Sequence, residues 1–401
     1  MNKRRAKGWL GFLVIGAMVF FQPAAGQAAE DVIKIGVPAP FSGSAAEKGK
    51  HLKYGVMLAA QEINAKGGVL GKKIELVYAD TEAKPEVGVS AYEKLITRDE
   101  VDFIVGEVNS HVALAVMDVV AKYGMPTLFA IPASDQLGEK ILTNPEKYGC
   151  IYMCDIPVSR MQEGAFIFLE EALQEGKLKR KEKSAALVYE DSSWGRIVGE
   201  TWKKSLEDRG WEIVLEEVTP FKESDYLSIV SKIRHLNPAL VKIEITSLPA
   251  GVALSKQLYQ AGITEDTDVF GGYYQKTKEF PQMAGPFAVG SFNVKEPYAP
   301  DWPSRLHNEY PEADVVASMM PYDSLHIMAE AIKRAGSREP DKVIEALGRT
   351  DHEGVFMRTV FDSKTHFAKV GKEYKLFGVA LFTKEGLGLI WPKDYAEIHF
   401  F

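Results

Sequence analysis

Short β-rich runs alternate with amphipathic helical runs from Val32 onward. The expected strands of the first half cover Val32–Val37, Ile74–Tyr78, Val101–Val105, Thr127–Ala130 and Ile151–Cys154. The helices expected between them cover Lys50–Lys66, Glu86–Arg98 and His111–Lys122. Within the first helix, apolar residues recur at i, i+3, i+4 and i+7 from Val56, which gives one buried face. Strand–helix alternation of this kind predicts a parallel sheet with right-handed crossovers.

The same pattern restarts after Asp155-Ile156-Pro157. Further strands are expected at Ala185–Tyr189, Glu212–Val218, Leu240–Ile245 and Val269–Gly271, and helices at Met161–Glu175, Gly195–Arg209, Tyr226–His235 and Gly251–Gln260. A linker at Lys295–Pro300 precedes helices at Val315–Arg334 and Pro340–Leu347, and hairpin-like strands are expected within Phe356–Trp391. Two such runs predict an α/β protein with two doubly wound parallel-sheet lobes.

Residues 1–28 differ in charge and hydropathy from the rest of the chain. The chain has 401 residues, 46% hydrophobic and 26% charged, which suits a soluble protein of two or three domains. Four basic residues, from Lys3 to Lys7, precede 14 apolar residues at Gly8–Phe21 and a small-residue stretch. Because 14 residues are fewer than the ~20 needed to span a membrane, we expect a signal peptide over residues 1–28, cleaved after Ala28.

Removal of the expected signal peptide makes the chain more acidic. It leaves 44 basic residues against 55 acidic ones, a formal charge of −11 by subtraction from the whole chain's −7. We therefore expect no nucleic acid as a partner and no insertion into a membrane. The two cysteines, Cys150 and Cys154, lie in a strand-like pattern about 13 Å apart, beyond the ~7 Å limit for bridged Cα atoms. We therefore favour free thiols. A disulfide between the two cysteines would require a turn in this segment.

Signals of catalysis are weak. The segment Gly43–His51 has five residues between its glycines where a phosphate-binding loop has four, and His51 stands where a hydroxyl residue is needed. The eight histidines show no metal-ligand spacing, and no Gly-x-Ser-x-Gly motif is present. We therefore expect no enzyme, catalytic residue, cofactor or metal, although an exported α/β enzyme remains an alternative.

Two loops after expected strands carry small polar residues suited to a ligand. In open parallel sheets, ligands lie outside the carboxyl ends of the strands. Ser110 follows the strand Val101–Val105 at an expected N-cap, and Ser134 follows the strand Thr127–Ala130. Hydroxyl and backbone N–H groups at helix starts suit a carboxylate. Helix capping alone explains Ser110 equally well, so both interpretations remain open.

Several segments resemble a known family. The runs Ile33–Gly43 (IKIGVPAPFSG) and Glu62–Gly71 (EINAKGGVLG), and Val105-Gly106 followed by a helix at Ser110, resemble the Leu/Ile/Val-binding protein family. This family comprises the type I periplasmic solute-binding proteins of ABC importers. The resemblance extends through Ser192–Gly195 and to the helix after Tyr322-Asp323. It covers most of the chain after the expected signal peptide.

The family's fold implies two α/β lobes joined by three crossovers that close on a solute. The crossovers are expected near Asp155–Pro157, Asn293–Tyr298 and Glu353–Phe356. The N-terminal lobe would comprise residues 29–155 and 296–353, and the C-terminal lobe residues 156–295 and 354–401. The protein is expected to act in the periplasm, as a monomer, and to deliver a small solute to an inner-membrane ABC permease.

The resemblance also implies ligand-binding residues. Ser110, Ala133 and Ser134 match the family's carboxylate-binding positions. Trp194 takes the aromatic position of the second lobe, and Tyr273 the position after the strand Val269–Gly271.

This sequence departs from the family at two of its site positions. Tyr273 stands where amino-acid-binding members have an acidic residue for the ammonium, and Lys48 stands where the family has an aromatic residue. Both departures shift the expected ligand towards acids without an ammonium; the alternative for Lys48 is that it points outwards, as most lysines do. The acids that could still accept an ammonium are Glu107, Asp155, Asp191, Glu244 and Asp323.

The sequence does not identify the solute. Branched-chain amino acids and other amino acids, aromatic acids, other organic acids, and urea or amides all remain possible. The alternative function is the ligand-binding domain of a signalling or chemoreceptor system for small amides or organic acids.

Overall fold

The computed structural model describes residues 31–276 and 279–401, so the expected signal peptide of residues 1–28 lies outside the described residues. The first sheet is entirely parallel and has the order β2-β1-β3-β4-β5. Its strands are β1 (Ile33–Ala39), β2 (Ile74–Asp80), β3 (Phe103–Gly106), β4 (Thr127–Phe129) and β5 (Ile151–Met153).

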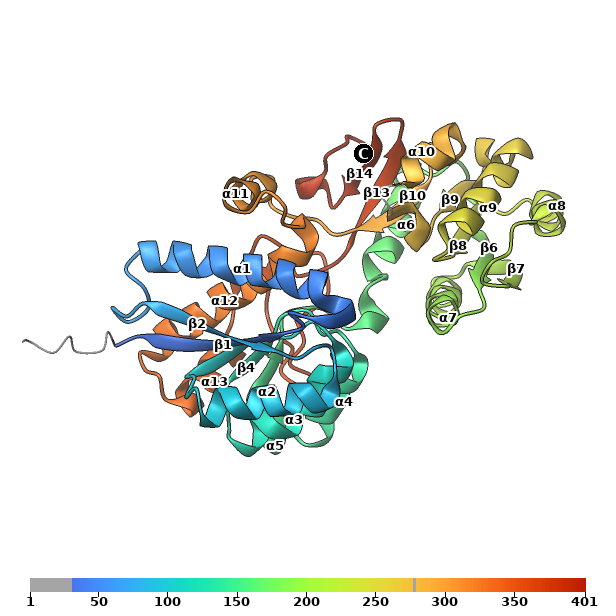
Figure 1. Ribbon diagram of the computed structural model, residues 1–401. Coiled ribbons are helices and arrows are strands. Elements are labelled where there is room, and N and C mark those ends of the chain that lie inside the picture. The colour runs from blue at the N-terminus through green and yellow to red at the C-terminus, as the bar shows by residue number, and fades with distance from the viewer. Residues whose placement is uncertain (1–30, 277–278) are drawn as a thin grey trace, which may run out of the picture. The chain divides into compact units, whose positions relative to one another are not determined.

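Helices cover both faces of this sheet (Figure 1). One face packs against α1 (Ala46–Ala65), α12 (Val315–Ala335) and α13 (Pro340–Gly348). The other packs against α2 (Pro85–Thr97), α3 (Ser110–Lys122), α4 (Asp135–Thr143) and α5 (Pro145–Tyr148). Because β3, β4 and β5 are covered on both faces and wholly buried, their sequences are nearly continuous apolar runs, whereas the edge strand β2 is only partly buried. We call this sheet with its helices the first lobe.

The second sheet has the order β14-β13-β10-β9-β8-β6-β7. Its strands are β6 (Ser184–Glu190), β7 (Glu212–Thr219), β8 (Leu240–Glu244), β9 (Asp268–Phe270), β10 (Phe292–Lys295), β13 (Gly378–Thr383) and β14 (Gly386–Trp391). The run from β7 to β10 is parallel, whereas β13 and β14 are antiparallel additions at one edge.

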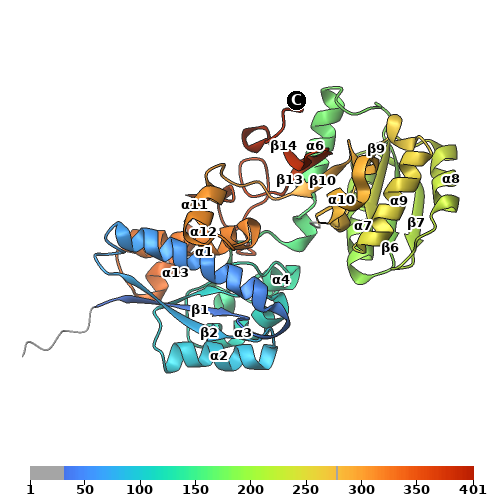
Figure 2. The same cartoon turned by 45° about the horizontal axis from the view of Figure 1, so that its top comes forward.

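The second sheet is also wound on both faces, as Figure 2 shows from another side. One face packs against α6 (Glu163–Gln174) and α7 (Ser193–Glu207), and the other against α8 (Leu227–Leu236), α9 (Leu248–Gln260) and α10 (Phe280–Ala284). We call this sheet with its helices the second lobe. The α/β architecture with two doubly wound lobes is thereby confirmed, with the difference that the second sheet is mixed rather than purely parallel.

The chain passes between the sheets at three places. The first passage follows β5, and the second leads from β10 to α11 (Trp302–Glu309), which packs beside α1 and α12. The third comes later than the expected Glu353–Phe356. Phe367 forms a parallel bridge with Met153 in β5, and the ring of His366 stacks on Tyr152. The chain therefore leaves the first sheet after residue 368, because the segment before it extends the edge of that sheet.

Most sequence-predicted elements are present, with bounds shifted by a few residues. The hairpin expected within Phe356–Trp391 is confirmed for β13 and β14. The segment ahead of it instead contributes β12 (Arg358–Thr359), paired with β11 (His352–Glu353). Cys150 and Cys154 are buried free thiols, as the strand pattern favoured.

Candidate functional site

The start of α3 and the start of α4 meet at Ser110. The Ser110 Oγ accepts hydrogen bonds from the backbone N–H groups of Ala133, at 3.2 Å, and Ser134, at 3.3 Å. Asn109 is the N-cap of α3, so the expected N-cap role of Ser110 is wrong by one residue, and Ser134 is the N-cap of α4. The three residues predicted to bind a carboxylate therefore lie together. Because the Ser110 Oγ accepts from both N–H groups, its hydroxyl proton is available for a ligand.

A turn in an unusual backbone conformation holds this serine cluster in place. A Cβ on Gly106 would lie 2.4 Å from the carbonyl oxygen of Pro38, so only glycine fits at the end of β3. Glu107 follows with φ +76° and is fully buried, and its Oε1 accepts from the N–H groups of Val108 and Asn109. Burial raises the pKa of Glu107 to about 7, although these hydrogen bonds oppose the rise.

A cavity of about 390 Å³ is lined by residues of both lobes. Lys48 and Met320 line it from the first-lobe helices α1 and α12, and Asp155 lines it from the segment after β5. The second lobe lines it at α7, β8, β10 and the turn after β9. The polar and aromatic side chains of this wall include Gln162, Trp194, Glu244, Tyr273, Lys276, Asn293, Glu296 and Phe377. The volume falls in the range of small-molecule sites.

The structure places the predicted residues in two groups. Lys48, Trp194 and Tyr273 line the cavity. Ser110, Ala133 and Ser134 form the serine cluster described above and do not line the cavity.

Trp194 is held by a buried ion pair. Its Nε1 donates to Glu244 Oε1 at 3.0 Å, and Lys242 Nζ donates to Glu244 Oε2 at 2.9 Å. Lys242 also donates to the carbonyl oxygen of Gly271 and lies 4.9 Å from the ring centre of Trp202. Burial lowers the pKa of Lys242, and the charge of Glu244 opposes this effect. The pair neutralises Glu244, so this acid presents no free charge to the cavity.

Two buried amides in the wall were missed by the sequence reasoning. Gln162 accepts from the indole N–H of Trp202 through its Oε1, and its amide N–H₂ makes no hydrogen bond with another described residue. Asn293 donates to Gly272 and Gln275, and its Oδ1 has no hydrogen-bond partner within the described part of the chain. Both can contact a ligand. The amides are ordinary residues of a helix start and a strand, so no sequence signal marked them.

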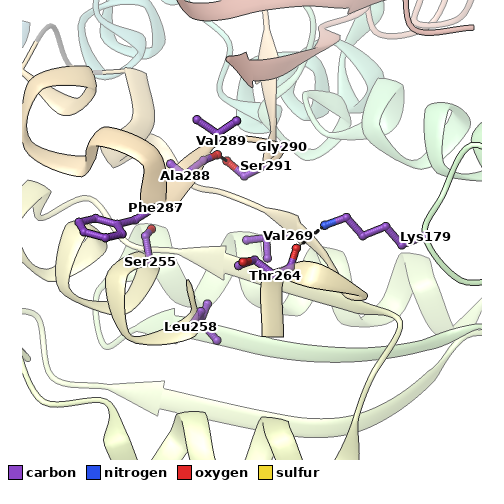
Figure 3. A pocket seen from close by; sticks show the side chains of 10 residues that line it. All are labelled: Lys179, Ser255, Leu258, Thr264, Val269, Phe287, Ala288, Val289, Gly290 and Ser291. Atoms are coloured by element: carbon purple, nitrogen blue, oxygen red, sulfur yellow. Dashed lines mark hydrogen bonds between the residues drawn. The ribbon is translucent and has the colours of Figure 1, made fainter. Parts of the chain in front are cut away.

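Other hollows are less suited to a ligand. Figure 3 shows a hollow inside the second lobe, where Lys179 donates to the carbonyl oxygen of Thr264 and Phe287 faces Ser255. The volume of this hollow, about 10 Å³, has room for a single water at most. A surface hollow of about 470 Å³ lies beside the first passage, but none of the charged side chains lining it, such as Arg160 and Asp362, is buried.

Within residues 31–276 and 279–401, no group of three or more metal-ligating side chains is close enough to hold a metal ion. No helix of this described part is long and apolar enough to cross a membrane.

The chain is similar to known proteins in sequence and in fold. The chain is 26% identical over 341 residues to "Leu/Ile/Val-binding protein homolog 3" of Brucella melitensis, covering 83% of this chain and 87% of the relative. A crystal structure from Silicibacter pomeroyi, described as a branched-chain amino acid ABC transporter, has a TM-score of 0.81 at 22% identity, covering 92% and 98% of the two chains. A solute-binding protein from R. palustris in complex with benzoate has a TM-score of 0.61 at 18% identity, covering 90% and 95%.

The family comparison covers most of the chain. Residues 32–372 match the family described as "Periplasmic binding protein", and these residues contain the serine cluster and every residue of the cavity wall except Phe377. The chain therefore belongs to the periplasmic binding protein family, as a type I member of its Leu/Ile/Val-binding branch.

Proposed function

We propose that this protein is the substrate-binding component of an ABC importer and binds a small carboxylate-bearing solute between its lobes. In this proposal the signal peptide directs the chain to the periplasm, and the monomer delivers its solute to an inner-membrane permease. Ligand contacts on both lobes favour a closed state, which the permease recognises.

The observation that carries the proposal is the cavity lined from both lobes. Its wall combines aromatic surface from Trp194 and Phe377 with polar atoms of Gln162 and Asn293 that have no hydrogen-bond partner among the described residues. Such a mixture of apolar surface and a few polar atoms is typical of solute sites. On closure, the Ser110 hydroxyl and the starts of α3 and α4 would supply donors for the carboxylate.

A thermal-shift screen of the purified protein tests this function. The panel contains branched-chain amino acids, aromatic acids, short organic acids, urea and simple amides. At 100 times its dissociation constant a ligand adds about 2.7 kcal/mol of stability. We expect at least one carboxylate to raise Tm and to be recovered unchanged, and urea and amides to have no effect. A shift with amides alone would refute a carboxylate site.

The double variant Ser110→Ala/Ser134→Ala tests the carboxylate-binding residues. We expect it to weaken binding of the best carboxylate at least tenfold in calorimetry, because a buried carboxylate loses hydrogen-bond donors. Ser337→Ala is the matched control, since the Ser337 hydroxyl also accepts a backbone N–H, from Glu339 at 3.0 Å, but does not line the cavity. Unchanged affinity in the double variant would refute this assignment.

A further inference from the structure

Cys154 and Lys375 form a buried contact between two passages of the chain. Cys154 follows β5 at the first passage, and Lys375 lies in the third passage, ahead of β13. Both residues are fully buried. The Nζ of Lys375 lies 3.2 Å from the Sγ of Cys154 and donates to the carbonyl oxygen of the same residue at 2.9 Å. An amine and a thiol that are 221 positions apart in the sequence therefore touch inside the protein.

Lys375 has no carboxylate partner among the described residues. Its Nζ makes hydrogen bonds only with the two atoms of Cys154. A buried ammonium is costly unless an anion or several hydrogen bonds balance its charge. Lys242, the other buried lysine of the described chain, has such an anion in Glu244 at 2.9 Å. For Lys375 the group in the place of that anion is the sulfur of Cys154.

The lysine changes the chemistry of the thiol. Burial raises the pKa of Cys154, and the charge of Lys375 opposes this rise. Asp155 and Asp323 are near enough to interact electrostatically with Lys375, but neither forms an ion pair with it. An ammonium beside a sulfur favours the thiolate, which is the form of cysteine that reacts with oxidants. Cys154 is therefore better placed to react than a buried cysteine in apolar surroundings.

The thiol lies next to residues that line the cavity between the lobes. Asp155 follows Cys154 in the chain, and the Sγ of Cys154 lies 3.9 Å from the carbonyl oxygen of Met320. Both Asp155 and Met320 line the cavity. Hydrogen peroxide is small and uncharged, so it can reach the thiol from this cavity. The periplasm, where we propose that this protein acts, is an oxidising compartment.

We propose that Cys154 and Lys375 form a modification site, at which hydrogen peroxide joins Sγ to Nζ through a sulfur–nitrogen bond. The thiolate attacks one peroxide oxygen, the O–O bond breaks, and the hydroxide released takes a proton from the Lys375 ammonium and leaves as water. Sulfur is thereby oxidised by two electrons to a sulfenic acid, and the peroxide is reduced. The lone pair of the neutral Nζ then attacks Sγ, and the S–O bond breaks as the hydroxyl leaves with one Nζ proton as a second water.

The new bond ties the first lobe to the second. Cys154 belongs to the first lobe, since its N–H donates to the carbonyl oxygen of Phe129 in β4. The segment after Lys375 belongs to the second lobe, because the carbonyl group of Phe377 lies so close to Gly164 of α6 that a Cβ there would overlap it. A covalent link between these segments restrains the rotation of one lobe against the other. The reaction needs no solute, so its outcome is independent of the proposed function.

Peroxide treatment of the purified wild-type protein, followed by protease digestion and mass spectrometry, tests the proposal. Cys150 is an internal control, because it is also a buried free thiol but contacts only the carbonyl oxygen of Val120 among the described residues. Burial raises the pKa of Cys150 to about 11. We expect Cys154 to be consumed at least tenfold faster than Cys150. Its main product should be a peptide pair joined to Lys375, lighter than the two free peptides by two hydrogen atoms.

The variant Lys375→Met removes the amine and keeps a side chain of similar length. We expect it to form no linked peptides and to lose Cys154 no faster than Cys150, whereas Cys150→Ser should still form the link. Treatment of the linked wild type with excess thiol should return both free peptides, since sulfur in this oxidation state is reducible. An unreacted Cys154, or its conversion to a sulfinic or sulfonic acid without a link, would overturn the proposal. The wild-type comparison of the two cysteines decides the question even if the variant does not fold.

Discussion

Replacement of Glu107 by glutamine should stabilise the protein at neutral pH and above. Glu107 is fully buried, and its Oε2 has no hydrogen-bond partner among the residues that the structure describes. Burial raises its pKa from 4.5 to about 7. Glutamine has nearly the same shape and keeps an oxygen that can accept from Val108 and Asn109. The substitution therefore removes a buried charge and preserves the turn.

The sign and size of the effect follow from the two pKa values. In the folded protein Glu107 holds its proton up to about pH 7, whereas in the unfolded chain it releases the proton near pH 4.5. The folded state thus binds more protons over this range, and the stability of the wild type falls as pH rises from about 4.5 to about 7. At 1.36 kcal/mol per pKa unit, the full loss at pH 8 is about 3 kcal/mol. Most of it, about 2–3 kcal/mol, develops between pH 5 and pH 8.

Urea unfolding at pH 5, 6, 7 and 8 measures this difference. We expect the stability of Glu107→Gln relative to wild type to increase by about 2–3 kcal/mol across the series. The contribution of other titrating groups, including Asp155, is common to both proteins and cancels. The control is Glu146→Gln, since Glu146 is exposed. Parallel wild-type and Glu107→Gln profiles from pH 5 to pH 8 would refute a buried carboxyl with a raised pKa at this position.

Two further substitutions test the packing of each lobe by urea unfolding. Lys242→Met should lower the free energy of unfolding by about 3–5 kcal/mol, because it leaves the carboxylate of Glu244 buried without its cation. The double variant Lys242→Met/Glu244→Gln should recover part of this loss. A loss below about 1 kcal/mol in Lys242→Met would contradict the ion-pair argument. Gly55→Ala should cost about 2 kcal/mol, because its Cβ would lie 2.2 Å from the carbonyl oxygen of Ser318 and force α1 and α12 apart. An unchanged midpoint in Gly55→Ala would show that the two helices tolerate the extra methyl group.

The fold was largely predictable because its signals are local. Apolar runs such as Ile33–Ala39 and amphipathic helices such as α1 appear in windows of a few residues, and their alternation limits the topology. The third passage was misplaced because its position depends on pairing between Phe367 and Met153, which are far apart in the sequence. The antiparallel edge of the second sheet depends on a similar long-range pairing, between β10 and β13.

The candidate site was predictable only in part. The residues Ser110, Ala133 and Ser134 meet as expected, since loops after neighbouring parallel strands lie at the same edge of a sheet. The pairing of Glu244 has a local signal, because Lys242 lies two residues before it on the same face of β8, whereas no lysine or arginine lies two residues from Asp155. The pair between Lys276 and Glu296, 20 positions apart in the chain, has no such local signal.

The sequence by itself determined the two-lobe architecture, and export stays a prediction. Its basic and apolar head predicts export, and its two runs of alternating strands and helices determine two α/β lobes, because hydrophobic periodicity specifies which face of each element is buried. Only the tertiary structure decided the electrostatics of the cavity. It pairs Glu244 with Lys242 and Glu296 with Lys276, and within the described residues it gives Asp155 and Lys48 no ion pair. The physical reason is that the charge a ligand meets depends on which charged side chains the fold brings into contact, as it does Lys276 and Glu296.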